Sequence, residues 1–323
     1  MKMKWLAAAM LAAGAQLVSP AHAQGSYPGK SIKILVPFSP GSLVDTIARL
    51  YSDKLSERMR QPVVVENKVG SGGIIATRTL LQAPADGYTL QMVSSSHAIN
   101  ATLYKDLPYD TANDLSCVGL VASSPTVISI SPSLKITSVK DFVEHVKKRP
   151  GKMNYGSGGI GTAAHLAGEY FVSRTGTEMV HVPYKGVQEA VMEIIGGRID
   201  LAFPPVSIAM PQMQAGKLTG LAVTGAERSP LLPDTPTAQE AGLEGFEYQI
   251  WYALLAPERT PEPVMQRLAT ELKAVSALPE IREKLVAQGI TPRDPVLGEC
   301  DDYIKAQIAE QGELVKASGA TAK

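Results

Sequence analysis

Residues 154–171, NYGSGGIGTAAHLAGEYF, decide how the rest of the chain is interpreted. Small and apolar residues recur at helical spacing from Ala163 to Phe171, and Thr162 stands directly before them as a candidate N-cap. The stretch therefore predicts a glycine-rich loop that leads into a helix. The first turn of a helix leaves backbone N–H groups unpaired and carries partial positive charge, and glycines let a ligand approach that backbone. We expect an anion site here, although the same glycines and cap would also suit a tight turn that binds nothing.

The first residues have the pattern of a secretory leader. Lys2 and Lys4 precede a short apolar run that ends in AHA at 21–23, the small-x-small pattern that signal peptidase recognises. We expect cleavage after Ala23 and export to the periplasm. The apolar run is too short to span a bilayer, so we expect no stable membrane insertion. The first cysteine is Cys117, far from the cleavage site, so we expect no lipid anchor.

Length and charge narrow the class of protein. The 323 residues, less the leader, exceed what one hydrophobic core usually organises, which suggests two domains. The 31 basic and 31 acidic residues balance, so no field of either sign favours nucleic-acid binding. Cys117 and Cys300 could pair in an oxidising compartment, but the sequence does not show whether they lie close together.

Apolar runs of strand length alternate with helical patterns along the chain, which is the βαβ pattern of a parallel sheet in an α/β protein. The runs at 122–125 and 248–255 are where we expect the chain to cross between two lobes, comprising 24–124 with 247–323, and 125–246. Strands are expected at 31–38, 61–66, 88–93, 117–121, 126–130, 178–182, 198–203, 218–223 and 248–255. Helices are expected from 43, at 74–82, at 138–149, at 163–171, at 186–195, after 205, and three times from 263 onward.

Four loops follow strands at the position where open α/β sheets bind ligands. They are 38–42, the polar loop 94–97 with Ser95 and His97, the glycine-rich loop 157–162, and 203–205 with Phe203 and Pro204. With the first two in one lobe and the last two in the other, they would face each other across a cleft. Such a cleft would hold a small anion from both sides.

Several strings along the chain resemble one family. They are VPF at 36–38, VVVEN at 63–67, DGYTL at 86–90, HLAGE at 165–169, HVPYKG at 181–186, LAVT at 221–224 and LLAP at 254–257. Together they resemble the Bug family of periplasmic solute receptors, which serve tripartite tricarboxylate transport systems. The resemblance runs from about Tyr27 to the C-terminus. It implies a type II periplasmic binding protein whose two lobes close on a carboxylate.

In that family, backbone N–H groups, hydroxyls and water from two loops hold the ligand carboxylate. Carried over to this chain, the resemblance implies the following ligand-binding residues: Phe38, Ser39, Gly41, Ser42, Leu43, Ser157, Gly158, Gly161, Thr162 and Ala163.

The chain departs from the family pattern in two places. Ser42 stands where many members have a second glycine, and Pro204 and Pro205 follow Phe203 where many have an acidic residue suited to the ammonium of an amino acid. Proline offers neither charge nor N–H, so a buried ammonium would lack a partner. We therefore expect a carboxylate without an α-amino group, such as a dicarboxylate or an aromatic acid lying against the Phe203–Pro204–Pro205 wall.

Two enzymatic interpretations remain as remote alternatives. Gly156, Gly158 and Gly161 fit a dinucleotide fingerprint, but no acidic residue follows the next strand, as NAD binding requires. Asp45 could join Ser95 and His97 in a hydrolase, but the chain has no GxSxG elbow. We expect neither catalysis nor a cofactor, and no CxxC, HExxH or calcium-loop motif predicts a metal.

The resemblance also implies a partner. The closed lobes of a monomer would dock on the permease subunits of a membrane transporter. The same fold could instead dock on the ectodomain of a sensor histidine kinase, and nothing in the sequence separates the two partners.

Overall fold

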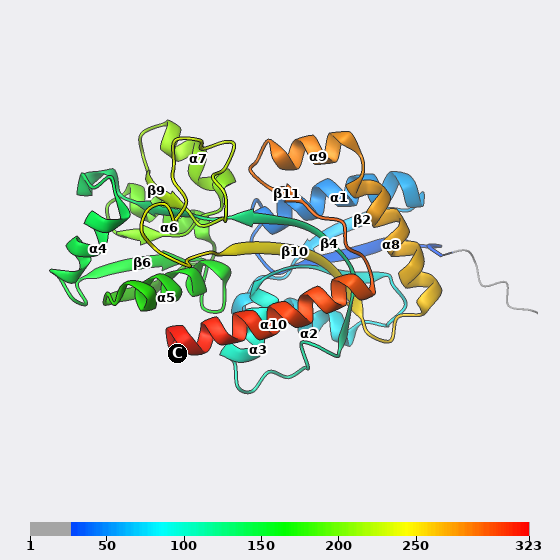
Figure 1. Cartoon of the computed structure of the whole chain (residues 1–323). Coiled ribbons are helices and arrows are strands. Elements are labelled where there is room, and N and C mark those ends of the chain that lie inside the picture. The colour runs from blue at the N-terminus through cyan, green and yellow to red at the C-terminus, as the bar shows by residue number, and fades with distance from the viewer. Residues whose placement is uncertain (1–26, 323) are drawn as a thin grey trace, which may run out of the picture.

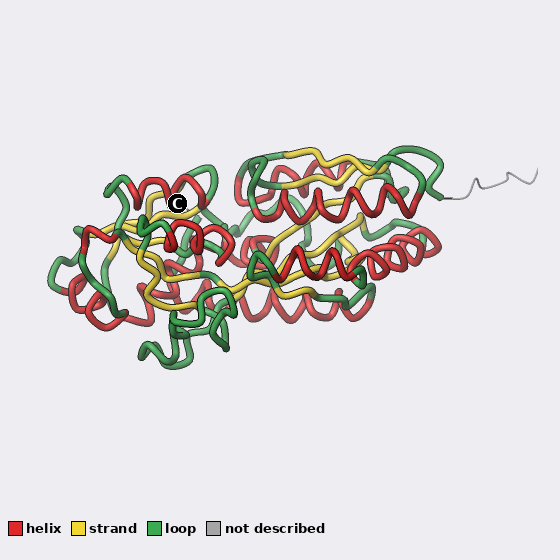
Figure 2. Tube along the Cα trace, turned by 90° about the horizontal axis from the view of Figure 1, so that it is seen from above, coloured by secondary structure: helices red, strands yellow, loops and turns green. Residues whose placement is uncertain are grey.

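The computed structural model of the protein describes residues 27–322, and the predicted leader with its cleavage site after Ala23 lies outside them. Figure 1 shows two lobes joined by long strands, each lobe built from a sheet with helices around it. Seen from above, helices flank the strands of both lobes (Figure 2). The architecture is the expected two-lobed α/β fold.

The first lobe contains a six-stranded sheet in the order β11-β4-β10-β3-β1-β2. Strands β1, β2 and β3 pair in parallel, as the βαβ pattern predicts, whereas β10, β4 and β11 pair antiparallel. The sheet is therefore mixed, a difference from the expected parallel sheet. Its strands are β1 (Ile32–Val36), β2 (Val63–Asn67), β3 (Thr89–Ser94), β4 (Leu115–Pro125), β10 (Gln249–Pro257) and β11 (Thr291–Pro292).

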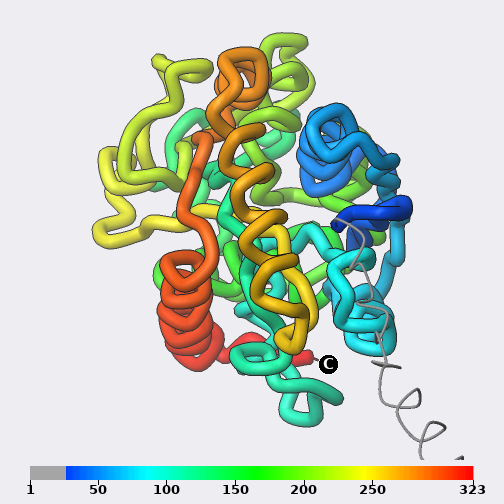
Figure 3. The backbone as a smooth tube through the Cα atoms, turned by 90° about the vertical axis from the view of Figure 1, so that its right-hand side faces the viewer, coloured from blue at the N-terminus to red at the C-terminus, as the bar shows by residue number. Residues whose placement is uncertain are grey.

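Helices from both ends of the chain cover this sheet. Figure 3 shows the late helices, in orange and red, toward the centre and left of the lobe, and the early ones, in blue and cyan, on the right. The helices are α1 (Leu43–Met59), the 3-10 turn η1 (Ser71–Gly73), α2 (Ile74–Gln82), α3 (Ser96–Leu103), α8 (Glu262–Ser276), α9 (Pro279–Val286) and α10 (Gly298–Ser318).

The second lobe contains a five-stranded sheet in the order β7-β6-β8-β5-β9, in which β6 pairs in parallel with β7 and β8. The strand expected at 198–203 is reduced to two residues. The strands are β5 (Val127–Ile130), β6 (Met153–Ser157), β7 (Met179–Pro183), β8 (Leu201–Ala202) and β9 (Thr219–Val223). The helices are the 3-10 turn η2 (Pro132–Leu134), α4 (Val139–Lys147), α5 (Ala163–Thr175), α6 (Val187–Ile195) and α7 (Val206–Gln214).

Capping side chains mark the starts of three helices. Thr162 caps α5 by accepting the N–H of His165, and Ser42 caps α1 by accepting the N–H of Asp45. At α4, Ser138 accepts the N–H of Asp141, as the capping-box spacing predicts. At these three helices the capping residue is thus visible in the sequence itself.

Two strands carry the chain between the lobes. Residues 122–125, expected as a link between two strands, are the end of one continuous strand, β4, and only Thr126 separates it from β5. The Thr126 N–H donates to Thr224 Oγ1 at 2.9 Å, and Thr224 Oγ1 donates to the Tyr248 carbonyl at 2.6 Å. Strand β10 returns, as predicted, and it pairs with β4, so the connection is a paired ribbon (Figure 1).

The largest difference from the sequence-based expectation is α3. Residues 94–97 were expected as a polar loop, but Ser94 ends β3 and α3 begins at Ser96. Helix α3 buries three polar side chains, Ser96, His97 and Asn100. A helix that buries polar residues lacks the apolar periodicity that identifies a helix from sequence.

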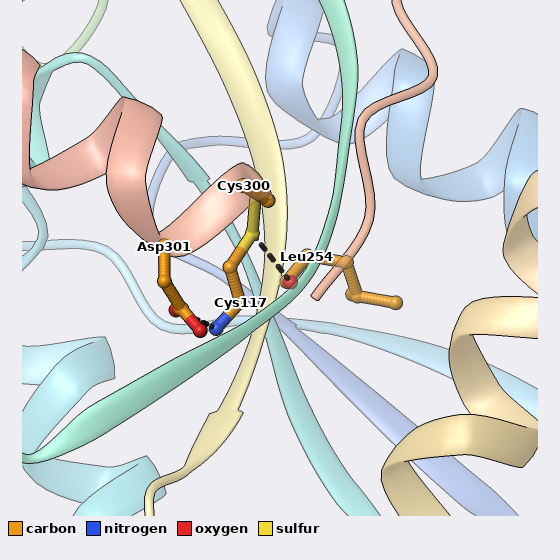
Figure 4. Close-up of a disulfide and its surroundings, with 4 residues drawn as sticks. All are labelled: Cys117, Leu254, Cys300 and Asp301. Carbon is orange, nitrogen blue, oxygen red and sulfur yellow. Dashed lines mark hydrogen bonds between the residues drawn. A yellow bond between two sulfur atoms is a disulfide. The ribbon is translucent and has the colours of Figure 1, made fainter. Parts of the chain in front are cut away.

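A disulfide joins Cys117 of β4 to Cys300 of α10, which resolves the pairing that the sequence left open (Figure 4). The Cys117 N–H also donates to Asp301 Oδ1 at 2.7 Å. Helix α10 then runs along the molecule to the second lobe, where Ser173 Oγ donates to the Ala317 carbonyl at 3.1 Å. The C-terminal helix is therefore fixed at both ends.

Candidate functional site

The loop between β1 and α1 forms one wall of the cleft between the lobes. Its Gly41 has φ of +80°, a conformation that side chains rarely adopt. The Gly41 N–H donates to Asp45 Oδ2 at 2.9 Å, and the Ser42 N–H donates to the Ser39 carbonyl at 3.1 Å. The first turn of α1 therefore fixes the conformation of the loop that precedes it.

Asp45 holds this loop from behind. Its carboxylate accepts from Arg49, and its Oδ1 accepts from Asn67 Nδ2 at 2.8 Å. Asn67 Nδ2 also donates to the Phe38 carbonyl at 2.9 Å. Burial would raise the pKa of Asp45, but the hydrogen bonds from Arg49, Gly41 and Asn67 outweigh it and lower that pKa. The ionised carboxylate of Asp45 thus stabilises the conformation of the loop.

The glycine-rich loop between β6 and α5 forms the facing wall. Gly159 and Gly161 have φ of +112° and +78°. Ser157 Oγ accepts the Gly159 N–H at 3.1 Å, and Thr162 Oγ1 donates to the Gly159 carbonyl at 2.7 Å. Two side chains therefore fix the path of the loop into α5.

A hollow of about 580 Å³, part of it open to solvent, lies between these walls. Its lining includes the first residues of α1 and of α5, and also residues at the start of α3, α6 and α7. None of the lining residues is Asp, Glu, Lys, Arg or His. Positive potential in the hollow therefore comes from helix N-termini, not from side chains.

Backbone N–H groups at two helix starts in this lining have no acceptor among residues 27–322. At α1, Ser42 satisfies the N–H groups of Asp45 and Thr46, which leaves those of Leu43 and Val44. At α5, Thr162 likewise satisfies His165 and Leu166, and the N–H groups of Ala163 and Ala164 remain. Two unpaired N–H groups from each lobe thus face one hollow, which is suited to a carboxylate with one oxygen toward each lobe.

The rest of the lining is mostly apolar. Phe203, Pro205 and Ile208 contribute from the second lobe, and Ile250 and Tyr252 from β10. Burial raises the pKa of Tyr252, so its phenol stays neutral. A ligand with one anionic end and an apolar or weakly polar body matches these surroundings.

The lobes touch beside the hollow. Gln188 Nε2 of the second lobe donates to the Gly41 carbonyl of the first at 3.1 Å. Gly161 packs so closely against Asn100 of α3 that a Cβ at Gly161 would lie 2.3 Å from Asn100 Oδ1. The two lobes are therefore in direct contact at the edge of the hollow.

The structure brings eight of the sequence-predicted site residues to the hollow: Phe38, Ser39, Ser42, Leu43, Gly158, Thr162, Ala163 and Phe203. Gly41, Ser157 and Gly161 lie in the same two loops but bond internally, to Asp45, His181 and His165. Pro204 is buried, and its carbonyl accepts the Val127 N–H at 2.8 Å.

Ser95 and His97 do not line the hollow. Ser95 is fully buried at the start of α3, and His97 lines a second, smaller hollow behind it with Gln91 and Asn100. Ser94 and Ser96, one residue to either side of Ser95, line the main hollow instead. The error follows from taking 94–97 as a loop, because only the actual strand end and helix start determine which serine faces the cleft.

The lining residues that were missed include two groups. Residues 186–188 follow β7 and start α6, the same topological position as the four loops considered, so the sequence carried a usable signal there. Ile250 and Tyr252 alternate along β10, and their direction depends on how that strand crosses between the lobes.

The structure also bears on the enzymatic alternatives. Asp45 bonds to Gly41, Arg49 and Asn67, and to no histidine. Strand β7, which follows the glycine-rich unit, ends at Pro183 with no acid. Within residues 27–322, no cluster of His, Cys, Asp and Glu is placed to hold a metal ion, and no helix has the length and apolarity needed to cross a membrane.

Comparison with known proteins gives consistent similarities. The sequence model of the family described as "Tripartite tricarboxylate transporter family receptor" matches residues 47–320. BugT of Bordetella pertussis is 32% identical over 313 residues, covering 96% of this chain and 96% of BugT.

Two solved structures are similar over most of the chain. R. palustris Rpa4515 with adipate has a TM-score of 0.87 and 33% identity, covering 91% of this chain and 99% of that chain. MatC from Rhodopseudomonas palustris with bound malate has a TM-score of 0.85 and 26% identity, covering 90% of this chain and 100% of that chain.

Proposed function

The chain belongs to the tripartite tricarboxylate transporter receptor family of Bug-type periplasmic solute-binding proteins, and we propose that it captures a small carboxylate without an α-amino group and delivers it to a tripartite tricarboxylate-type permease. In this proposal the lobes are 24–124 with 247–323, and 125–246, and they close by bending at the crossing strands. The protein acts as a monomer and not as an enzyme.

One observation carries the proposal: the unpaired N–H groups of two helix N-termini, one in each lobe, face the same hollow. Leu43 and Val44 supply them from α1, and Ala163 and Ala164 from α5. A carboxylate that bonds to both pairs is stabilised only when the lobes are closed. Ligand capture and closure are then one event, and the closed shape is what a permease would recognise.

The absence of an acid among the lining residues supports the exclusion of α-amino acids. An ammonium in this hollow would lose its hydration without gaining an ionic partner, which is unfavourable. Pro205, in the lining after Phe203, offers no N–H and no charge. The ligands named for the two similar structures, adipate and malate, are carboxylates without an amino group.

The test is thermal unfolding of protein that has been unfolded in denaturant and refolded to remove any co-purified ligand. The panel contains mono-, di- and tricarboxylates, aromatic acids, amino acids and NAD. A ligand at a hundred times its Kd adds about 2.7 kcal/mol of stability, which raises the midpoint by a few degrees. A shift with carboxylates supports the proposal, whereas a shift with NAD alone contradicts it.

A sensor role with the same ligand is the second candidate, because a kinase ectodomain would also recognise the closed lobes. Uptake of the labelled carboxylate by a strain lacking this protein separates the two. Loss of uptake supports transport, and unchanged uptake with a lost transcriptional response supports sensing.

A further inference from the structure

A cluster of aromatic and titratable side chains lies directly behind the glycine-rich loop. It consists of Tyr155 on β6, His165 and Glu169 on α5, and His181 on β7, and we call it the histidine cluster. The His165 and His181 ring centroids lie 4.2 Å apart, and His181 stacks on Tyr155 at 4.9 Å. None of the four residues lines the hollow. Ligand contact therefore does not explain why two imidazoles are packed together here.

His165 supports the end of the loop that leads into α5. The Gly161 N–H donates to His165 Nδ1 at 3.4 Å, so Nδ1 carries the lone pair and the ring proton sits on Nε2. Nε2 lies 3.7 Å from Glu169 Oε1, which accepts a hydrogen bond from the Tyr155 hydroxyl. The ring is thus oriented by its neighbours with one acceptor directed at the loop.

His181 supports the beginning of the loop. Its Nε2 lies 2.7 Å from Ser157 Oγ, and the same Oγ accepts the Gly159 N–H at 3.1 Å. Each histidine therefore reaches a different part of the loop, and the two rings touch each other. The histidine cluster therefore contacts the loop near both of its ends.

The contact of His165 with Gly161 requires a neutral imidazole, because Nδ1 must accept the Gly161 N–H. Burial lowers the pKa of His165 to about 4, and burial together with the neighbouring His165 lowers the pKa of His181 to about 3. A proton on His165 Nδ1 would direct one N–H at another, the Gly161 N–H. Glu169 and Tyr155 are the other titratable groups in contact with the rings, from α5 and β6.

We propose that His165 and His181 are positioning residues that hold the glycine-rich loop in the shape that presents the N–H groups of Gly158, Ala163 and Ala164 to the ligand. The inference rests on the proposed function for its affinity readout. The conformation of the loop can be tested without any ligand. Removing the ring nitrogen that contacts Gly161 or Ser157 would loosen the loop and weaken binding without altering a residue that lines the hollow.

Paired substitutions separate the hydrogen bond from the packing. In His165→Asn the amide oxygen falls close to the position of Nδ1 and can accept the Gly161 N–H, whereas His165→Leu cannot accept it. His181→Gln places a polar group near Nε2, whereas His181→Phe keeps the stacking on Tyr155 and loses the bond to Ser157. Val146→Ala, in the core of the same lobe at α4, is a control for lost stability.

The first readout needs no ligand: amide hydrogen exchange at Gly161, followed by NMR in glycine-labelled protein. We expect faster exchange in His165→Leu, and exchange near the wild-type rate in His165→Asn and Val146→Ala. Equal exchange in His165→Leu and wild type would overturn the inference, even if the protein bound no carboxylate at all.

The second readout is calorimetry with the panel carboxylate that gives the largest thermal shift. We expect His165→Leu and His181→Phe to lose about tenfold or more in affinity, with the Asn and Gln variants close to wild type. Val146→Ala should lower the unfolding midpoint and leave affinity unchanged. Equal losses in the matched variants, or none in either, would show that the rings only fill space. Failure of the wild type to bind any carboxylate would refute the proposed function instead.

Discussion

Replacing Ala163 with proline would remove one backbone N–H from the anion site while leaving the helix able to form. Ala163 is the first residue of α5, and its N–H has no acceptor among residues 27–322. Proline is favoured at the first helical position, where its missing N–H breaks no helical hydrogen bond. Thr162 has φ of −84° and ψ of 159°, the extended conformation that a residue before proline prefers. The substitution therefore suits the fold.

The expected loss of affinity follows from the lost hydrogen bond. A hydrogen bond to a charged group contributes about 1.5–3 kcal/mol, which corresponds to roughly 10- to 160-fold in Kd. The proline Cδ replaces the amide hydrogen and reaches toward the ligand, so the lower figure is a minimum. Because the folded protein loses no internal hydrogen bond, its stability should stay constant or rise by about 0.4–1 kcal/mol.

Calorimetry on refolded protein measures the affinity, and thermal unfolding without ligand measures the stability. Ala163→Gly is the matched control, because it keeps the N–H and also changes the side chain. We expect the glycine variant to bind like wild type and the proline variant to bind much more weakly. Binding by the proline variant within about twofold of wild type would refute the assignment of the carboxylate to this helix N-terminus.

Three further predictions concern closure, the disulfide and pH. Gly161→Ala would place a Cβ 2.3 Å from the facing lobe, at a residue with φ of +78°. The lobes should therefore stay apart, and small-angle scattering should show no compaction when ligand is added. Compaction equal to that of the wild type would contradict this prediction. Replacing Cys117 and Cys300 with alanine removes a disulfide that spans a sequence separation of 183. The free energy of unfolding measured in urea should fall by about 5 kcal/mol, because the unfolded chain is no longer constrained. An unchanged urea midpoint would contradict this prediction. Burial lowers the pKa of His165 to about 4 in the folded protein, so below pH 6.5 the unfolded chain binds more protons than the folded one. The free energy of unfolding should therefore fall as the pH is lowered from 7.5 to 5, by about 2 kcal/mol for this residue. The His165→Asn variant should show a correspondingly shallower pH dependence in urea unfolding, and an equally steep one would disprove the buried neutral imidazole.

The sequence was sufficient where local signals and hydrophobic periodicity agree. Thr162 followed by a helical apolar pattern predicted α5 and its cap, and the long apolar run near Trp251 predicted the crossing strand β10. The glycine-rich loop could be placed beside the cleft because strand ends and helix starts have fixed positions in α/β sheets.

Other features depend on tertiary contacts that sequence patterns do not contain. The three serines at 94–96 favour a loop on composition, yet Ser94 ends β3 and Ser96 begins α3, which packs against α10. Gly161 was expected to bind the ligand, but its N–H donates to His165 Nδ1, four residues later in the first turn of α5. That competition appears only when the ring orientation is known.

The most direct test of the central claim is calorimetry with matched pairs of acids that differ only in an α-amino group: succinate and aspartate, adipate and 2-aminoadipate, phenylacetate and phenylglycine. The hollow offers the unpaired N–H groups of two helix N-termini to a carboxylate and no acid to an ammonium. We therefore predict that, in the pair that binds, the acid without the amino group binds at least about tenfold more tightly. Tighter binding of the amino acid in that pair, or binding by no pair and no other carboxylate, would contradict the account.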